Sequence, residues 1–231
     1  MPTLAVLATI PGREAALAIC LRSLRPQVDE IRVVCNGFSE PPAIVTELAD
    51  SYDLDPVDQH GSAAKLRFAA AWTGLYLGCD DDLEYPADYV ERMRGRVQRW
   101  KGRAIVTCHG RILKPAATSF LSVEAAWAPQ QANPGAWINY PGGCAIAFDS
   151  RLALPAFVPG KNLEEAHLAV WAQRRGVPIW LAAHDAGWLR YLLNGTKLPT
   201  IWAEEKAVRF ANRNRVLAPI GNGEGWKVYH A

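Results

Sequence analysis

The sequence lacks several features that would narrow its class. Its five cysteines form no Cys-x-x-Cys pair, which disfavours a zinc site or a disulfide framework and favours reduced, buried thiols. The 25 basic and 23 acidic residues nearly cancel, so the net charge of +2 does not indicate a nucleic-acid partner. No apolar run approaches the roughly 20 residues of a membrane span, and no basic region typical of a signal peptide opens the chain. These absences predict a soluble, cytoplasmic protein.

The first half of the chain alternates between two kinds of apolar pattern. Continuous apolar runs predict strands at residues 4–9, 31–35, 75–79 and 104–109. Helical spacing predicts helices at residues 14–24, 41–52, 62–72 and 86–100. Such alternation in 231 residues predicts one α/β domain with a doubly wound, mostly parallel sheet. Ligands of these sheets bind beyond the C-terminal ends of the strands.

The second half is less regular. Residues 114–143 carry four prolines and are expected to form a long loop, often a functional feature in a compact domain. Strands are expected at 145–148 and 178–183, with a helix at 162–175 between them. After residue 184 the pattern becomes irregular and rich in basic residues and glycine, so no element is expected there.

Three consecutive acids follow the predicted strand 75–79. Asp80, Asp81 and Asp82 repel one another, and a divalent cation is the simplest compensation because hard cations prefer oxygen ligands shared with substrate phosphates. The structural alternative is an acidic turn that caps the helix opened by Tyr85-Pro86. The position at a strand-to-helix junction favours the metal interpretation.

Three ordered motifs resemble a known family. They are TIPGR at residues 9–13 together with 23–29 and Asn36-Gly37, the acidic stretch 77–89, and Glu164-Glu165 ahead of Gly176. Together they resemble nucleotide-sugar glycosyltransferases of the GT-A fold, similar to family 2 enzymes of bacterial surface-polysaccharide synthesis. The resemblance implies one domain, 1–231, with a nucleotide-sugar-binding half at 1–110, an acceptor half at 111–190 and a mobile basic tail at 191–231.

The resemblance also implies site residues. The Asp80-x-Asp82 pair matches the metal motif, with Asp82 nearest a divalent cation, Mn²⁺ or Mg²⁺. His184 lies where some GT-A enzymes complete the metal site, although a structural histidine is equally compatible with its position. The residues expected to bind the nucleotide are Thr9, Pro11, Arg13, Asn36, Lys65, Asp80 and Asp81. Arg13 and Lys65 are also compatible with ordinary surface positions, and relatives often carry an acid near Lys65.

Glu165 falls where the family places its catalytic carboxylate, here in a Glu-Glu rather than a Glu-Asp pair. The alternative is a capping box in which Asn162 caps the helix and Glu165 reaches back to the backbone. Trp127, Trp137 and Trp188 are the tryptophans whose expected loop positions would let them stack on a sugar.

The resulting prediction is an inverting, metal-dependent glycosyltransferase. It would move a sugar from a nucleoside-diphosphate sugar, with UDP favoured, to a glycan or another hydroxyl acceptor. A sugar-phosphate nucleotidyltransferase is the first alternative, disfavoured because Pro11-Gly12-Arg13 is poor in glycine for a phosphate loop. A non-catalytic nucleotide- or glycan-binding module is the second.

Overall fold

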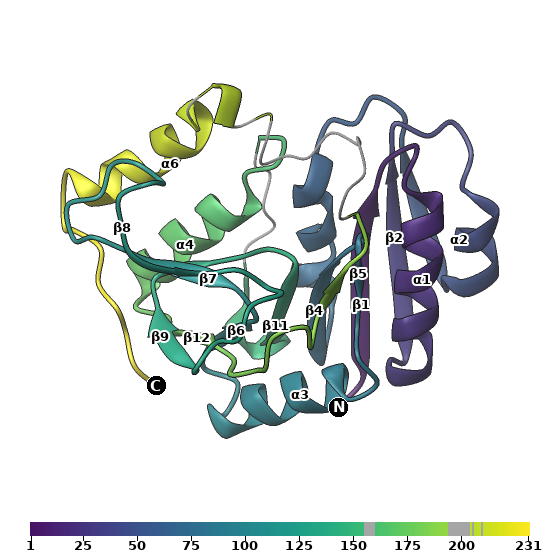
Figure 1. The fold of residues 1–231 in the computed structure, drawn as a ribbon, viewed down its shortest axis with the longest axis horizontal. Helices are drawn as coiled ribbons and strands as arrows, with labels where there is room; N and C mark the ends of the chain where they lie inside the picture. The colour runs from purple at the N-terminus through teal and green to yellow at the C-terminus, as the bar shows by residue number, and fades with distance from the viewer. Residues whose placement is uncertain (155–159, 194–203, 205, 209) are drawn as a thin grey trace.

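The computed structural model describes residues 1–154, 160–193, 204, 206–208 and 210–231. A large twisted sheet runs through the centre of the molecule, with helices on both faces (Figure 1). None of the described helices is long and apolar enough to cross a membrane.

The large sheet has eight strands in the order β3-β2-β1-β4-β11-β6-β12-β9. They are β1 (Thr3–Thr9), β2 (Glu30–Asn36), β3 (Ser51–Asp55), β4 (Leu75–Asp80), β6 (Ile105–Thr107), β9 (Ala136–Ile138), β11 (Ala145–Asp149) and β12 (Ile179–Leu181). The pairs β1/β2, β1/β4, β2/β3 and β6/β12 are parallel, whereas β11 and β9 run antiparallel to their neighbours. The predicted α/β fold with a mostly parallel sheet is confirmed.

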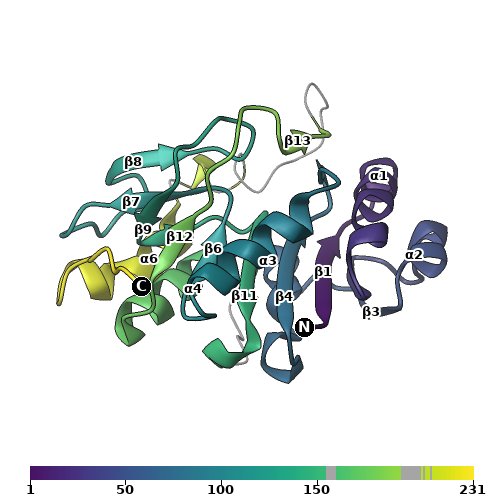
Figure 2. The same ribbon diagram turned by 90° about the horizontal axis from the view of Figure 1, so that it is seen from below.

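Both faces of the sheet are buried. In β1, Ala5 and Leu7 belong to a core shared with α1 (Glu14–Leu24) and α3 (Tyr89–Arg99). Leu4 and Val6 point the opposite way, into a core shared with α4 (Glu164–Arg175). Successive side chains of a strand face opposite sides, so a continuous apolar run is what a doubly covered strand requires. Seen from below, α3 lies across the middle of the sheet (Figure 2).

Residues 114–143 are not the single long loop that the sequence predicted. They contribute β8 (Val123–Trp127) and β10 (Tyr140–Pro141), which flank β7 (Gly110–Leu113) in a three-stranded antiparallel sheet, and also β9. The prolines misled the prediction, because Pro141 sits in a two-residue strand and the others sit between strands.

The expectation of an irregular end is wrong for residues 211–221. Residues 211–221 form α6 (Ala211–Gly221), whose Leu217 and Ile220 pack against Ala166 and Ala169 of α4 in a third core. Figure 1 shows α6 beside α4 at the far end of the molecule. Residues 194–203, 205 and 209 of the predicted mobile tail lie outside the described residues.

Several helix boundaries differ from the predictions. Residues 61–71 form two short 3₁₀ helices, η2 (Gly61–Leu66) and η3 (Ala69–Ala71), because spacing alone does not separate 3₁₀ from α over so few residues. The helix predicted at 41–52 is α2 (Ala43–Leu48), because the chain then enters β3. Helix α3 starts at Tyr89 rather than Pro86, since β5 (Leu83–Glu84) first pairs with β13 (Arg190–Tyr191).

Candidate active site

A cavity of about 340 Å³ opens at the C-terminal ends of β1, β2 and β4. It collects eight of the ten predicted site residues, namely Thr9, Arg13, Asn36, Lys65, Asp80, Asp81, Asp82 and Glu165. Pro11 is exposed and His184 is buried, and neither lines this cavity. The strand ends therefore gather residues from both halves of the chain, as expected for a doubly wound sheet.

The acidic triplet is held against Arg13. Its guanidinium lies 2.7 Å from Oδ1 of Asp81 and 3.2 Å from Oδ2 of Asp82. Burial, reinforced by Asp80 and Asp81, raises the pKa of Asp82 to about 7, and burial also raises the pKa of Asp81. Even with the Lys65 ammonium paired to Asp80, two cations face three neighbouring carboxylates, and the cluster carries excess negative charge that a bound cation would relieve.

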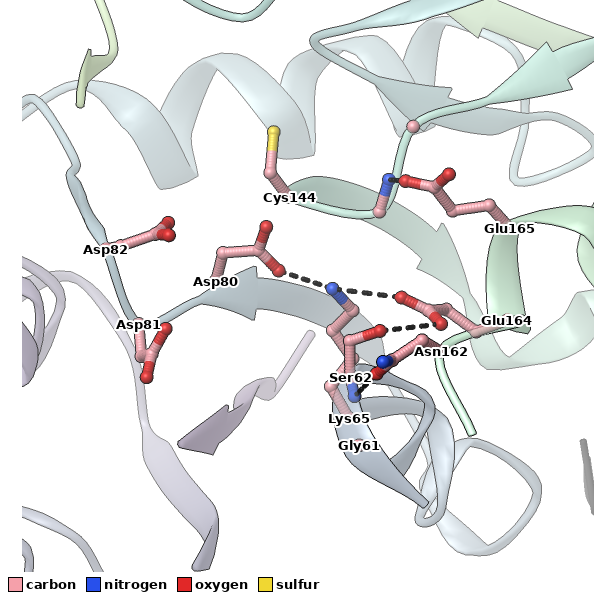
Figure 3. A network of polar contacts seen from close by, with 12 residues as sticks. Gly61, Ser62, Lys65, Asp80, Asp81, Asp82, Cys144, Asn162, Glu164 and Glu165 are labelled. Atoms are coloured by element: carbon pink, nitrogen blue, oxygen red, sulfur yellow. Dashed lines mark hydrogen bonds and ion pairs between the residues drawn. The ribbon is translucent and has the colours of Figure 1, made fainter. Parts of the chain in front are cut away.

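The carboxylates of the triplet face different ways. Figure 3 shows Asp80 and Asp82 projecting into one space and Asp81 pointing to the other side of the chain. The described residues contain no group of three or more His, Cys, Asp and Glu side chains arranged to hold a metal. Asp80 and Asp82 nevertheless fit Mg²⁺ or Mn²⁺, which are commonly held by one or two carboxylates together with substrate phosphates.

Lys65 joins the two halves of the site. Its buried ammonium pairs with Asp80 at the end of β4 and lies 3.3 Å from Oε1 of Glu164 on α4 (Figure 3). Burial opposes the charge, but Asp80 and Glu164 outweigh it and raise the pKa of Lys65. The hydroxyl of Ser62 donates to Oε2 of Glu164 at 2.8 Å, so both oxygens of Glu164 are engaged. The structural alternative of a surface lysine is wrong.

Glu165 is not a helix cap. Helix α4 is preceded by Leu163 at its N-cap and has no side-chain cap, while Oδ1 of Asn162 accepts from the amide of Ser62 instead. The carboxylate of Glu165 accepts from the amide of Gly143 at 2.6 Å and pairs with Arg213 of α6. Burial would raise its pKa, but Arg213, His109 and the Gly143 amide lower it to about 2.

A thiol and an imidazole lie beside Glu165. Sγ of Cys144 is 2.9 Å from Nδ1 of His109, and Nε2 of the same ring is 3.8 Å from Oε1 of Glu165. The ring packs on Gly142, where an added Cβ would lie 1.9 Å from it, so only glycine fits. Burial lowers the pKa of His109, although nearby Glu165 opposes this shift, and burial raises the pKa of the Cys144 thiol.

Several polar groups around the cavity lack partners. Within the described residues, nine buried side-chain atoms have no hydrogen-bond partner, and five of these belong to cavity-lining residues. They are Thr9 Oγ1, Arg13 Nε, Asn36 Oδ1, Asp58 Oδ1 and Asp81 Oδ2, of which the Thr9 and Asp81 side chains also interact with each other. Unsatisfied buried polar atoms are costly, and their concentration here indicates where a polar ligand binds.

Other predicted candidates lie elsewhere. Both ring nitrogens of His184 are 3.0 Å from backbone oxygens, those of Asp185 and Cys108, which is a structural environment. Trp137 packs with Trp100 and Trp180, and Trp188 packs with Tyr89. None of the three tryptophans singled out for sugar stacking lines the cavity.

Comparisons with known proteins bear on the fold. No family model and no curated protein matches the chain. The solved glucosyl-3-phosphoglycerate synthase from Mycobacterium tuberculosis, in complex with phosphoglyceric acid, is similar in structure, with a TM-score of 0.61 over 94% of this chain and 80% of that one. A second crystal structure of a mycobacterial protein gives a TM-score of 0.60 over 94% and 74%. The chain has the GT-A fold.

Both solved neighbours share only 17% of their residues with this chain, so the likeness establishes architecture and not chemistry. On this GT-A scaffold, sequence reasoning missed several cavity residues, which are Arg111, Phe120, Cys144, Tyr191 and Arg213. Arg213 had a detectable signal, because it precedes Leu217 and Ile220 at helical spacing. Arg111 and Tyr191 lie on short strands that only tertiary pairing defines, and Phe120 and Cys144 lie in turns next to strands.

Proposed function

We propose that this protein is a glycosyltransferase that moves a sugar from a nucleoside-diphosphate sugar to a hydroxyl acceptor with the help of a divalent cation. The observation that carries the proposal is the convergence of unpartnered buried polar atoms and excess carboxylates on one cavity of the GT-A fold. Polar atoms left without partners are what a nucleotide with many donors and acceptors would satisfy.

The donor is assigned to the wall formed by β1, β2 and β4. Oδ1 of Asn36 is buried and can accept an N–H of the nucleotide base, while Nδ2 is fixed by the carbonyl of Gly61 at 2.9 Å. Arg13, with its Nε unpartnered, can donate to the diphosphate. UDP is the favoured nucleotide because the resemblance to family 2 enzymes implies it. The buried acceptor oxygen of Asn36, which can accept one N–H of a base, supports this choice.

Asp80 and Asp82 would hold the cation. A divalent ion bound there supplies Lewis-acid neutralisation of the diphosphate as it leaves. Both carboxylates are held in place by cations, because Lys65 pairs with Asp80 and Arg13 lies 3.2 Å from Asp82. The raised pKa of Asp82 would fall when positive charge binds.

Glu165 is assigned to the acceptor side. Glu165 lies in the same cavity and is ionised, so it can accept a hydrogen bond from an acceptor hydroxyl. It can then take the proton of that hydroxyl while the hydroxyl oxygen attacks the anomeric carbon. Its low pKa makes Glu165 a weak base. Stabilisation of the departing diphosphate is therefore expected to contribute more to the rate than proton removal by Glu165. Direct attack would invert the anomeric centre.

A second candidate is a nucleotide-binding module without transferase activity. The observation that favours it is the engagement of Glu165 by Arg213 and Gly143, which leaves the carboxylate weakly basic. The two candidates share the donor site and differ only in turnover.

A two-stage experiment tests the proposal. Nucleotide sugars are first screened by thermal shift with and without Mn²⁺, and a donor at 100 times its Kd should raise the Tm by about 5–10 °C. The stabilising donor is then incubated with hydroxyl acceptors, starting with phosphoglyceric acid because the solved neighbour binds it. Acceptor-dependent release of nucleoside diphosphate supports a transferase, and NMR of the product gives its anomeric configuration. Binding without release supports the module, and no binding refutes both.

A further inference from the structure

The C-terminal helix α6 places one buried cationic side chain, that of Arg213, in the site. The side chain of Arg213 is 7% exposed and its guanidinium contacts both the carboxylate of Glu165 and the hydroxyl of Tyr140. Its Nη2 lies 3.4 Å from the carbonyl of Asn162, just before α4. One guanidinium therefore joins α6 to the start of α4 and to β10.

The position of Arg213 is fixed by packing. Leu217 follows it by one helical turn and is fully buried in the core shared with α4. On its other side, the guanidinium carbon lies 4.7 Å from the ring centre of Phe120, a cation–π distance. Moving Arg213 away from Glu165 therefore requires α6 to leave its core or the side chain to leave Phe120.

Several charged or titratable groups face Glu165 from different elements. They are Arg213 on α6, His109 after β6, Tyr140 on β10, Arg111 on β7, Lys65 on η2 and neighbouring Glu164 on α4. Glu164 is already engaged by Lys65 and Ser62, and burial lowers the pKa of His109. Arg213 is a permanent cation in direct contact with the carboxylate, and Lys65 and Arg111 also act on Glu165 electrostatically.

We propose that Arg213 is a positioning residue, which keeps Glu165 ionised and holds it against Gly143, so that α6 is part of the catalytic apparatus. The catalytic role of α6 rests on the proposed function, whereas the coupling between Arg213 and Glu165 does not depend on it. A carboxylate left in this buried place without its cation would take up a proton and lose its fixed orientation. An exposed tail could be deleted freely, whereas this helix could not.

The coupling is tested by NMR titration of protein labelled with ¹³C at the side-chain carboxyl of glutamate. The Glu165→Gln variant assigns the resonance. In the wild type Glu165 should titrate near 2, and in Arg213→Gln it should titrate above the ordinary 4.5. Arg213→Lys should lie between them. Arg215→Gln is the matched control, since Arg215 is exposed on the same helix and should leave the titration unchanged.

The catalytic part is tested by the pH dependence of kcat for the donor and acceptor found above. In Arg213→Gln the acidic limb should move up with the new pKa, with kcat falling more than KM rises, and Arg213→Lys should restore part of the rate. An unchanged titration or an unchanged acidic limb in folded Arg213→Gln overturns the proposal. If that variant does not fold, Arg213→Lys decides by the same two measurements. Absence of transfer by the wild type refutes the proposed function, and the titration still decides the coupling.

Discussion

Oε1 of Glu165 accepts a hydrogen bond from the backbone amide of Gly143 at 2.6 Å, which ties the first turn of α4 to the chain entering β11. The approach is possible because residue 143 has no side chain. A Cβ there would lie 3.1 Å from Oε1 of Glu164, 3.1 Å from Nζ of Lys65 and 3.2 Å from Oε1 of Glu165. Three charged groups from two halves of the site thus converge on one glycine.

Gly143→Ala should disturb the site more than the fold. The methyl group must push aside Glu164, Lys65 or Glu165 by a few tenths of an ångström, and misplaced catalytic groups can lower turnover by about 10²-fold. The measurement is kcat with the donor identified by thermal shift. Gly95→Ala is the control, because Gly95 lies in α3 with no atom within 4 Å of its added Cβ, and it should stabilise the protein by about 1 kcal/mol. Wild-type turnover in Gly143→Ala would contradict this account.

The sequence was informative wherever one element suffices to define a feature. Helix α1 was predicted with both ends correct, and strands β1, β2 and β4 were found within one residue, because a doubly buried strand leaves an apolar run. The placement of the acidic triplet followed from β4 and from the rule that such sheets bind ligands at their strand ends. The same rule was enough to predict that Arg13, Asn36 and Asp82 lie at one cavity.

Features that depend on pairing between distant parts of the chain could not be predicted from the sequence. The small sheet β10-β7-β8 is made of strands of two to five residues, whose side chains carry too few positions to show alternation. Asn162 and Glu165 satisfied the capping-box spacing, but Ser62 and Gly143 compete for the same side chains in the folded chain. Arg213 was assigned to a basic tail. Its partner Glu165 lies 48 residues earlier, and a local pattern does not show a contact over that separation.

Lys65→Met should be strongly destabilising. The change removes the cation between Asp80 and Glu164 and leaves a buried carboxylate without its ion pair, which typically costs 3–5 kcal/mol. Urea denaturation at pH 7 measures the free energy of unfolding. Lys161→Met is the control, since Lys161 is half exposed beside Asp58 and its ion pair should contribute less than about 1 kcal/mol. Equal losses in both variants would show that Lys65 does not hold the two halves together.

Asp82→Ala should abolish the effect of a divalent cation on nucleotide binding. The cluster loses one of the two carboxylates that face the same space, so fewer oxygen ligands remain for Mn²⁺. Calorimetry should show nucleoside-diphosphate affinity raised by Mn²⁺ in the wild type and unaffected by it in the variant. Asp53→Ala serves as the control, because Asp53 pairs with exposed Arg67 outside the cavity. A preserved Mn²⁺ effect in Asp82→Ala would move the cation to other residues.

Glu164 and Glu165 are adjacent acids with different partners, and a pair of substitutions separates their roles. Glu165→Gln keeps an acceptor for the Gly143 amide but removes the proton acceptor and the charge facing Arg213, so turnover should fall by about 10²-fold or more. Glu164→Gln keeps the hydrogen bond from Ser62 and does not face Arg213, so turnover should change less.

Stability provides an independent check on Glu165. Its pKa is lowered to about 2 in the folded protein, so its charge stabilises the fold above the unfolded-state pKa of about 4.3, and this contribution is lost as pH falls toward 2. The contribution corresponds to about 3 kcal/mol at pH 7. Glu165→Gln should therefore lose about that much at pH 7 in urea denaturation, and roughly half as much at pH 3. A loss that does not depend on pH would mean that Glu165 is not held ionised by Arg213, and near-normal turnover would make Glu164 the residue that accepts the proton.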